Sequence, residues 1–334
     1  MDLRARRTSS GLLYGILASV YLNLNRFDDA AKLIQQANEH KVDAEGLHSV
    51  AYQLAFLNGD AAEMSRQVDW ARGKPGQEDH LLSQQSDTEA YYGKFGRARN
   101  VMRQAIESAT QNDSTEAAAV WHLNAALREA EFGNQAMAKQ EVRAALALAS
   151  DRDIKLLAAL VFARTGQNAR VQPIVGELGK NHPSNTYFKF YWLPAIKAAL
   201  ELGAGNSARA LMLLETVAPY ELGTVEPEQS WTMYPVYLRG QAQLSTHNGS
   251  GATVEFQKFL DHRGVAGNSP LAALALLGLA RAKALQATPL QSEDADAARV
   301  RALTLYKSFL TLWKDADPDI PILRQAKAEY AKLQ

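Results

Sequence analysis

The chain has 334 residues, with 36 basic and 36 acidic side chains and no cysteine. Balanced charge provides no overall field that would draw nucleic acid or an anionic membrane. The lack of cysteine excludes disulfides, thiolate metal sites and a cysteine nucleophile. Alanine occurs 56 times and proline only 11 times, so the composition predicts a nearly all-helical protein.

The chain starts with MDLRARRTSSGLLYGILASVYLNL, in which arginines precede an apolar run. This order is the outline of a signal peptide, and Arg6-Arg7 suggests a twin-arginine signal. However, Tyr14, Tyr21 and Asn23 interrupt the apolar run, and no convincing small-x-small cleavage site follows. The same residues fit a repeat pattern, so we expect the first helix here. No run of 18 apolar residues occurs, and we expect no membrane-spanning helix.

This repeat pattern combines two helical faces separated by a break at Asn25. Its first copy consists of Tyr14, Leu17, Ala18, Tyr21, Ala30, Ile34 and Ala37, at offsets x, x+3, x+4, x+7, x+16, x+20 and x+23. The first four residues lie on one face of a helix and the last three on one face of a second helix. Small residues at x+4 and x+16 allow two antiparallel helices to approach closely. The pattern resembles the tetratricopeptide repeat (TPR).

The pattern recurs along the whole chain. Position x+16 is occupied in turn by Ala30, Met64, Ala98, Ala138, Val171, Ala210, Ala252 and Ala302, at intervals of 34, 34, 40, 33, 39, 42 and 50 residues. Residues that tolerate a left-handed conformation precede most of the second helices, namely Asn25, Gly59, Gly93, Gly133, Gly166 and Gly205. The last interval contains about twelve extra residues, ATPLQSEDADAA, which we interpret as a loop or an extension of the following helix.

We therefore predict an all-α, TPR-like superhelical solenoid forming a single domain over residues 1–334. Its hairpins are expected at about 11–44, 45–78, 79–112, 119–150, 152–184, 191–222, 233–265 and 270–316, followed by a capping helix at 319–334. At the joint before that helix, Asp315, Asp317 and Asp319 alternate like the start of a calcium loop. Positions six and twelve hold Ile320 and Ala326 where an EF-hand needs glycine and glutamate, so we expect a joint in which Asp319 caps the last helix.

Several stretches resemble a narrower group of proteins. They are AFLNGDAAEM (55–64), APYELG (218–223), YPVYLRGQAQL (234–244), EFQKFLDHRGV (255–265) and FLTLWKDADPDIPILRQAKAEYAKLQ (309–334). Together they resemble the C-terminal repeat region of large bacterial, acidobacterial-type, eukaryotic-like serine/threonine protein kinases. The resemblance implies a protein-interaction region that follows a kinase domain in such proteins. We expect a cytoplasmic location by default, or an extracytoplasmic one if a membrane-anchored kinase tethers the chain or if the N-terminus is a signal.

The kinase motifs themselves are absent from this sequence. His262-Arg263-Gly264 lacks the aspartate of a catalytic loop, and Gly203-Ala-Gly205 lacks the third glycine of a phosphate loop. None of the seven histidines forms an H-x-x-x-H or H-E-x-x-H pair. We therefore predict a non-catalytic protein with no cofactor and no metal site.

Binding in such repeats belongs to the concave face, to which offsets x−2, x+1, x+5 and x+8 point. The candidate contacts chosen with this rule are Gln53, Phe56, Asp87, Leu123, Leu127, Trp192, Tyr234, Tyr237 and Gln241. They lack the converging basic residues of a carboxylate clamp. For Trp192 and Tyr237, packing at hairpin junctions is the alternative to ligand contact.

The predicted function is therefore a protein- or peptide-binding scaffold, as the interaction or regulatory region of a kinase-type signalling protein. The alternatives are a secreted or periplasmic assembly scaffold with an N-terminal signal, and an enzyme with an unrecognised site in the groove. The expected partners are proteins or peptides and not nucleic acid. The chain is expected to be a monomer or a weak homo-oligomer, since an uncapped first hairpin could stack on another copy.

Overall fold

The computed structural model describes residues 3–223, 231–287 and 293–334, which contain helices but no strand. The α-helices are α1 Leu3–Asn23, α2 Phe27–Glu39, α3 Glu45–Asn58, α4 Ala61–Ala71, α5 Glu78–Tyr91, α6 Phe95–Gln111, α7 Thr115–Glu131, α8 Gln135–Leu148, α9 Arg152–Arg164, α10 Val171–Asn181, α11 Leu193–Gly203, α12 Ser207–Leu214, α13 Tyr234–Ser245, α14 Gly249–Asp261, α15 Arg263–Ala266, α16 Pro270–Gln286, α17 Glu293–Leu312 and α18 Pro321–Leu333. Three short helices of other types are η1 Asn168–Arg170, η2 Phe188–Trp192 and η3 Glu215–Tyr220.

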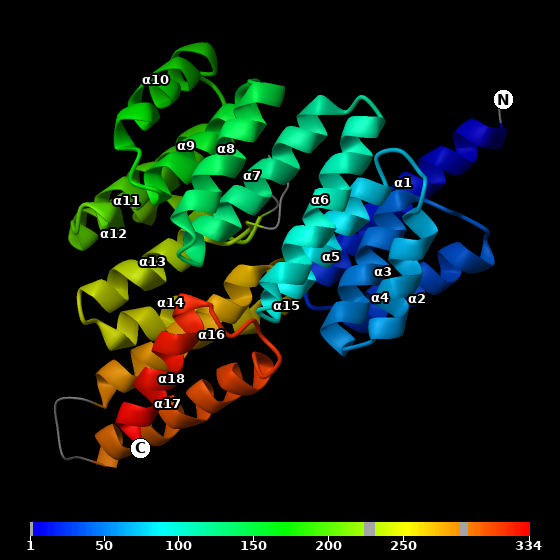
Figure 1. The fold of residues 1–334 in the computed structure, drawn as a ribbon. Coiled ribbons are helices and arrows are strands. Elements are labelled where there is room, and N and C mark those ends of the chain that lie inside the picture. The colour runs from blue at the N-terminus through cyan, green and yellow to red at the C-terminus, as the bar shows by residue number, and fades with distance from the viewer. Residues whose placement is uncertain (1–2, 224–230, 288–292) are drawn as a thin grey trace.

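Successive helices pair into hairpins, and the predicted all-α TPR-like class is confirmed (Figure 1). The eight pairs in the described part of the chain are α1/α2, α3/α4, α5/α6, α7/α8, α9/α10, α11/α12, α13/α14 and α16/α17, with α18 after the last pair. Each predicted turn residue has a positive φ: 57° at Asn25 and between 70° and 91° at Gly59, Gly93, Gly133, Gly166 and Gly205.

The alanines of the repeat are covered on all sides. Ala18, Ala30, Ala98, Ala138, Ala210, Ala252 and Ala302 expose none of their surface. Small side chains at these positions bring the two helices of a hairpin close together, as the pattern predicts. The spacing of the core is therefore set by local sequence in each hairpin.

Two local features differ from or refine the prediction. Asp319 does not cap the last helix, because α18 begins at Pro321 with Ile320 at the N-cap and no side-chain cap. Ile320 is buried in the core, and Pro321, whose fixed φ suits the first helical position, begins the helix directly after it. In the extra segment before Ala302, α17 begins at Glu293, so the described part of that segment extends the second helix.

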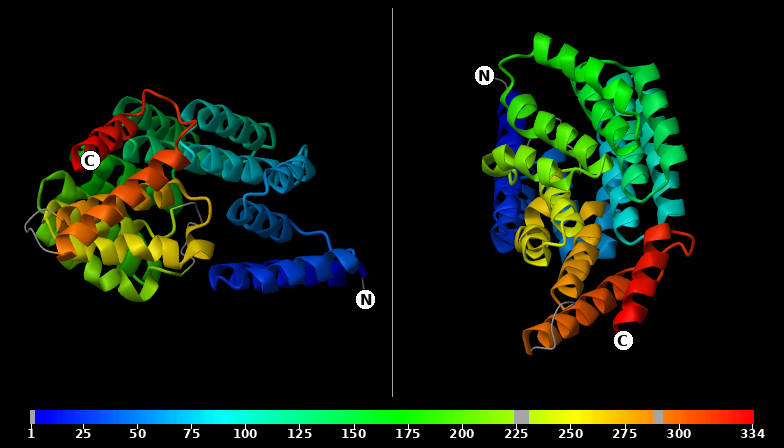
Figure 2. Two further views of the ribbon diagram at one scale, coloured as in Figure 1. Left: turned by 90° about the horizontal axis from the view of Figure 1, so that it is seen from below. Right: turned by 90° about the vertical axis from the view of Figure 1, so that its left-hand side faces the viewer.

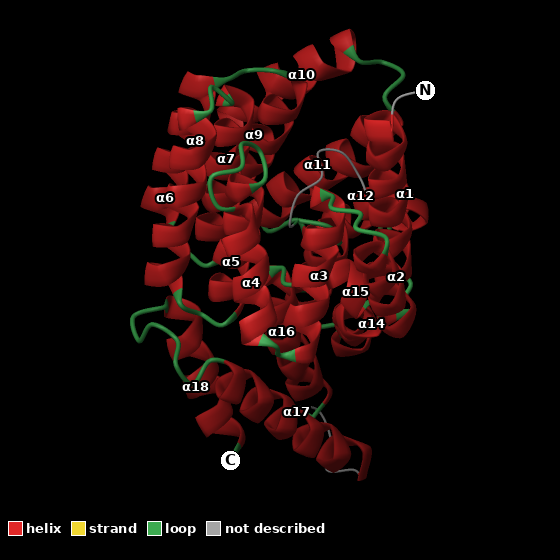
Figure 3. Ribbon diagram, turned by 90° about the vertical axis from the view of Figure 1, so that its right-hand side faces the viewer, coloured by secondary structure: helices red, strands yellow, loops and turns green. Residues whose placement is uncertain are grey.

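The array does not stay open but returns to its own first hairpins. Helix α15 packs against α1 and α3, and α16 packs against α5 (Figures 1 and 3). We call residues 262–269, which hold α15 and the turn into α16, the closure segment. The two ends of the chain nevertheless lie on opposite sides of the molecule, because α17 and α18 extend beyond the closure (Figure 2).

A second contact joins the end of α17 to the turn between α5 and α6. Trp313 donates from Nε1 to the carbonyl oxygen of Tyr91 at 2.9 Å, and the Asp317 backbone N–H donates to the carbonyl of Gly93 at 3.0 Å. The Asp317 carboxylate accepts a hydrogen bond from the backbone N–H of Gly96 at 2.7 Å. The N-cap of α6 is Lys94, whose side chain makes no capping bond. Asp317 therefore caps α6 from 221 residues away.

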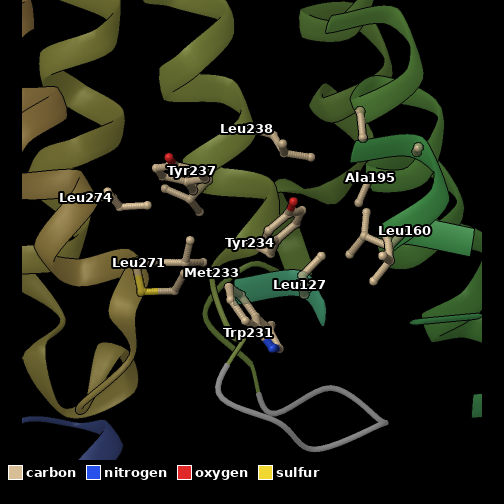
Figure 4. Close-up of a cluster of buried hydrophobic side chains, with 14 of the residues drawn as sticks. Leu127, Leu160, Ala195, Trp231, Met233, Tyr234, Tyr237, Leu238, Leu271 and Leu274 are labelled. Atoms are coloured by element: carbon tan, nitrogen blue, oxygen red, sulfur yellow. The ribbon is translucent and has the colours of Figure 1, made fainter. Parts of the chain in front are cut away.

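The central core lies between the middle and the last hairpins. Trp231, Met233, Tyr234 and Tyr237 lie between Leu127 and Leu160 on one side and Leu271 and Leu274 on the other (Figure 4). All of these side chains are buried. Residues from the start of α13 thus fill the inner side of α7 and α9.

Candidate binding groove

An open groove runs along the inner side of α1, α3 and α5. It consists of two adjoining cavities of about 220 and 940 Å³. Both cavities are lined by Ser19, Asn23, Ser49, Val50 and His80, so they form one continuous channel. The inner surface of the first three hairpins is therefore accessible to a ligand.

One wall of the groove is aliphatic. Leu12, Ile16 and Val20 follow each other at intervals of four residues on α1 and line the larger cavity. All three remain exposed. An aliphatic wall of this kind stabilises a ligand that covers it with apolar side chains.

The floor consists of hydrogen-bonding side chains from α3 and α5. Gln84 donates from Nε2 to Ser49 Oγ at 2.5 Å, and the same nitrogen lies 2.9 Å from Nε2 of His80. The His80 ring lies edge-on to Trp121, with centroids 6.1 Å apart. Hydroxyl, amide and imidazole groups provide both donors and acceptors, which suits the backbone of a peptide.

The closure segment forms the opposite wall. Asn268 donates from Nδ2 to the carbonyl of Gln84 at 2.6 Å and to Thr88 Oγ1 at 2.9 Å, and it accepts from Gln53 Nε2 at 2.8 Å. Asn25 holds the other end, accepting from the Gly264 N–H at 2.8 Å and donating to the carbonyl of Asp261 at 2.6 Å. A ligand in the smaller cavity therefore contacts both the first hairpin and the closure segment.

Charged groups are found at the mouth of the groove, where Lys41, Asp43 and Glu45 line the larger cavity. Asp43 Oδ1 lies 2.7 Å from Nε2 of His48, whose ring stacks on Trp70. Glu45 lies 4.0 Å from His80. Among the described residues, no group of three His, Asp or Glu side chains is placed to hold a metal ion.

The predicted contacts fall into two sets. Gln53 lines the groove, where it bonds to the closure segment. The other eight face neighbouring segments of the chain: Phe56, Asp87, Leu123, Leu127, Trp192, Tyr234 and Tyr237 are buried, and Gln241 is half-buried. Phe56 meets Tyr91 edge-to-face at 5.0 Å, and Trp192 meets Tyr191 in the same way at 4.9 Å. Contact of these eight predicted residues with a ligand stays a prediction.

Asp87, one of these eight predicted contacts, forms a buried ion pair with Arg128. Arg128 Nη1 lies 3.1 Å from Asp87 Oδ1, and both side chains are fully buried. The same guanidinium donates to Ser86 Oγ at 2.9 Å, and Asn124 donates to Asp87 Oδ2 at 3.2 Å. Trp231 in turn donates from Nε1 to Asn124 at 2.5 Å. The concave face of α5 and α7 is thus tied to the segment before α13.

Tyr234, Tyr237 and Gln241 belong to a second buried network. Arg164 binds Glu131 through two hydrogen bonds of 2.6 and 2.7 Å, and the Tyr234 hydroxyl donates to the same carboxylate. Gln241 accepts from Arg164 at 3.1 Å and donates to the Tyr237 hydroxyl at 2.9 Å. Burial and the charge of Glu131 raise the pKa of Tyr234 well above its usual value, so the phenol stays protonated.

The groove residues that sequence reasoning missed follow the same offsets. With x at residue 14, offsets x−2 and x+5 are Leu12 and Ser19, and with x at 48, offset x+1 is Ser49. With x at 82, offset x−2 is His80. These positions were available from the repeat pattern. The repeat pattern did not identify Asn268, because the place of this residue in the groove depends on the closure of the array.

Comparisons with known proteins give a structural likeness but no match in sequence. No protein-family model matches the chain, and no curated protein matches it. Its structure is similar to the crystal structure of the P58(IPK) TPR domain, at 13% identity and a TM-score of 0.28, over 97% of this chain and 99% of that chain. The assignment of the fold therefore comes from the chain's own helix pairs, spacing and turn residues. None of the described helices is long and apolar enough to cross a bilayer.

Proposed function

We propose that this protein is a non-catalytic scaffold that binds a segment of another protein in the groove of α1, α3 and α5. The observation that carries the proposal is the groove itself, which combines an exposed aliphatic wall with a hydrogen-bonding floor. Small sites of this composition bind peptides through apolar side chains and backbone hydrogen bonds. The closure segment, as the opposite wall, limits the width of the ligand to a single segment.

The buried charged networks favour binding over catalysis. Arg164, Glu131 and Tyr234 contact one another in the core. Burial alone would lower the pKa of Arg164, but the charge of Glu131 outweighs it and raises that pKa, and burial together with Glu131 raises the pKa of Tyr234. Such buried pairs stabilise a defined arrangement of helices. A catalytic group, in contrast, must be accessible to a substrate. The groups that face the groove are mainly hydroxyls and amides, with His80 and the charged side chains at the mouth as the ionisable ones.

For the biological role, we propose the interaction or regulatory region of a bacterial serine/threonine-kinase-type signalling protein. The support is the resemblance of FLTLWKDADPDIPILRQAKAEYAKLQ and the shorter stretches to the repeat regions of such kinases. The reading frame upstream of Met1 tests this role. A kinase domain encoded there supports it, and an unrelated domain counts against it.

The groove is tested by selecting displayed random peptides on the purified chain. Selected peptides are then measured by calorimetry against the wild type, Ser49→Glu in the groove and Asn100→Glu on the outer helix α6. Burying a new carboxylate should weaken binding by about tenfold or more for Ser49→Glu. The same charge change at the exposed Asn100 should leave the affinity unchanged. Equal affinity for all three proteins would place the ligand elsewhere.

A further inference from the structure

Helices α1 to α4 pack together as one unit, which we call the N-terminal arm (Figure 1). The backbones of α1 and α3 lie in close contact, because a Cβ on Gly15 would lie 3.3 Å from the Cα of Gly46. The first three helices also share a hydrophobic cluster, whose buried members are Ala18, Leu22, Ala30, Ala37, Leu47, Val50 and Leu54. The arm is therefore well packed internally.

The joint between the arm and the closure segment is polar. Hydrogen bonds of 2.6 to 3.2 Å form this joint, and the pairs are Asn25 with Asp261 and Gly264, Leu57 with Arg263, and Gln53 with Asn268. The aliphatic side chains of the closure segment, Val265 and Ala266, belong instead to the central core or pack against it. When such a joint opens, its groups exchange their hydrogen bonds for bonds to water, so its net strength is modest.

The contact between α17 and the turn from α5 to α6 is of a different kind. Trp313 stacks on Phe132 with ring centroids 5.9 Å apart, and it meets Phe95 edge-on at 6.5 Å. All three rings are buried. Buried aromatic surface stabilises a contact more strongly than hydrogen bonds near the surface do. The third hairpin is thus anchored to the last one by aromatic packing, whereas the arm meets the closure segment through hydrogen bonds.

The loop between the arm and the third hairpin has the features of a hinge. It extends from the end of α4 to the start of α5 and reads RGKPGQ (72–77). Gly73 and Gly76 have φ values of 71° and 77°, and a Cβ on either would meet no atom within 4 Å. Glycine without close neighbours can change its backbone angles at little cost. Short loop segments of this kind absorb the rotation of one packed unit against another.

We propose that the N-terminal arm turns about residues 72–77, opening and closing the groove against the closure segment, and that a bound ligand holds it closed. The role of the ligand rests on the proposed function. The smaller cavity is lined by Ser19, Asn23 and Gln53 of the arm and by residues 264–269 of the closure segment. A ligand contacts both sides only when the joint is closed, and a ligand shifts an equilibrium by its difference in affinity for the two states.

Asn25 is a positioning residue in this arrangement. Its side chain bonds to the closure segment, but it lines neither cavity of the groove. Its φ is 57°, a conformation that glycine adopts without strain. Asn25→Gly therefore removes two hydrogen bonds of the joint while preserving the turn and every ligand contact. The matched control is Asp113→Gly, at an exposed turn residue between α6 and α7 whose φ is 54°.

The first experiment measures distances between pairs of spin labels, which the absence of natural cysteine makes possible. Lys32→Cys on α2 with Val254→Cys on α14 reports on the joint, and Val254→Cys with Val300→Cys on α17 is the control pair; all three residues are exposed. The first pair should show a shorter and a longer distance, and the control pair a single one. Asn25→Gly should raise the ratio of longer to shorter distances about tenfold, and Asp113→Gly should leave it unchanged. A single distance that Asn25→Gly does not alter would overturn the proposal.

The second experiment adds a peptide selected on the purified chain. At saturation it should bring the labels at residues 32 and 254 to the shorter distance. Its Kd should be about twofold to tenfold higher for Asn25→Gly, because less of that protein is closed, and unchanged for Asp113→Gly. Bound peptide that leaves both the distances and the Kd of Asn25→Gly unchanged would overturn the proposal. Failure to select any peptide would count against the proposed function instead, since the distances without peptide still decide whether the arm opens.

Discussion

The inner faces of the early and the later hairpins differ in whether other segments of the chain cover them. Along α1, α3 and α5 the inner face borders an open groove, whereas along α7 and α9 it is filled by Trp231, Tyr234 and their neighbours. Both regions are built from the same helical hairpin. The difference arises because residues 231–233, just before α13, enter the curve of the array, while the closure segment lies at the edge of the groove.

This contrast shows that the repeat sets the positions that face inward but not what covers them. Asp87 on α5 and Ser49 on α3 both follow the inward offsets. Asp87 ends in a fully buried ion pair, and Ser49 lines the groove. Substitutions in the filled region should therefore affect stability differently from substitutions at the open groove.

The largest effect is expected from breaking the buried ion pair of the filled region. Arg128→Met leaves the Asp87 carboxylate buried without its cation, which should lower the free energy of unfolding by about 3–5 kcal/mol. Urea denaturation measures this loss. The double variant Asp87→Leu/Arg128→Met should recover part of it. Arg66→Met removes an exposed partner of Glu63 and should change stability by less than about 1 kcal/mol.

A methyl group at Gly264 should disturb the edge of the open groove. A Cβ there would lie 1.7 Å from the carbonyl oxygen of Leu22, so the closure segment must move away from α1. We expect Gly264→Ala to lower stability by about 2–3 kcal/mol and to increase the radius of gyration in solution scattering. Gly176→Ala in α10, where the added carbon meets no atom within 4 Å, should not destabilise the protein. A Gly264→Ala protein as compact and stable as the wild type would contradict the tight closure.

Glu221 should make the stability of the protein depend on pH. Burial alone would raise the pKa of Glu221, but hydrogen bonds from Lys258 and Arg239 outweigh it and lower that pKa below the usual value. The stabilisation is therefore complete above the unfolded pKa, about 4.3, and is lost as the pH falls through the lower folded value. Glu221→Gln should lower stability at neutral pH by about 1–2 kcal/mol and flatten its decline in acid. Denaturation at a series of pH values tests both effects; an unchanged acid decline would exclude Glu221 as a contributor.

The smallest effect is expected at the joint between the last hairpin and α6. Asp317→Ala removes the cap on the Gly96 N–H and should cost about 1 kcal/mol. Hydrogen exchange at the Gly96 amide should become faster. Asp315→Ala, at an exposed neighbour, should leave both quantities unchanged. Equal exchange rates in the two variants would show that Asp317 does not cap α6.

The local architecture could be predicted from the amino-acid sequence because its causes lie within one hairpin. The alanines at x+16, the glycines of the turns and the apolar offsets each reflect burial between helices that are adjacent in the chain. The same offsets identify Leu12, Ser19, Ser49 and His80 as inward-facing residues. Capping at the terminal joint was predicted less well, since the helix begins at Pro321 and Asp319 lies one residue before the N-cap.

Only the tertiary structure decided which inward positions are open and which are covered. Asn268 contacts Gln53 across 215 residues, and Asp317 contacts Gly96 across 221. Such contacts depend on the angle between each hairpin and the next, summed over the whole array. No periodicity in the sequence reports that sum, because a small change at each junction moves the distant end by a large distance. The sequence therefore determines the hairpins and their inner faces, and the accumulated curvature determines where the groove remains.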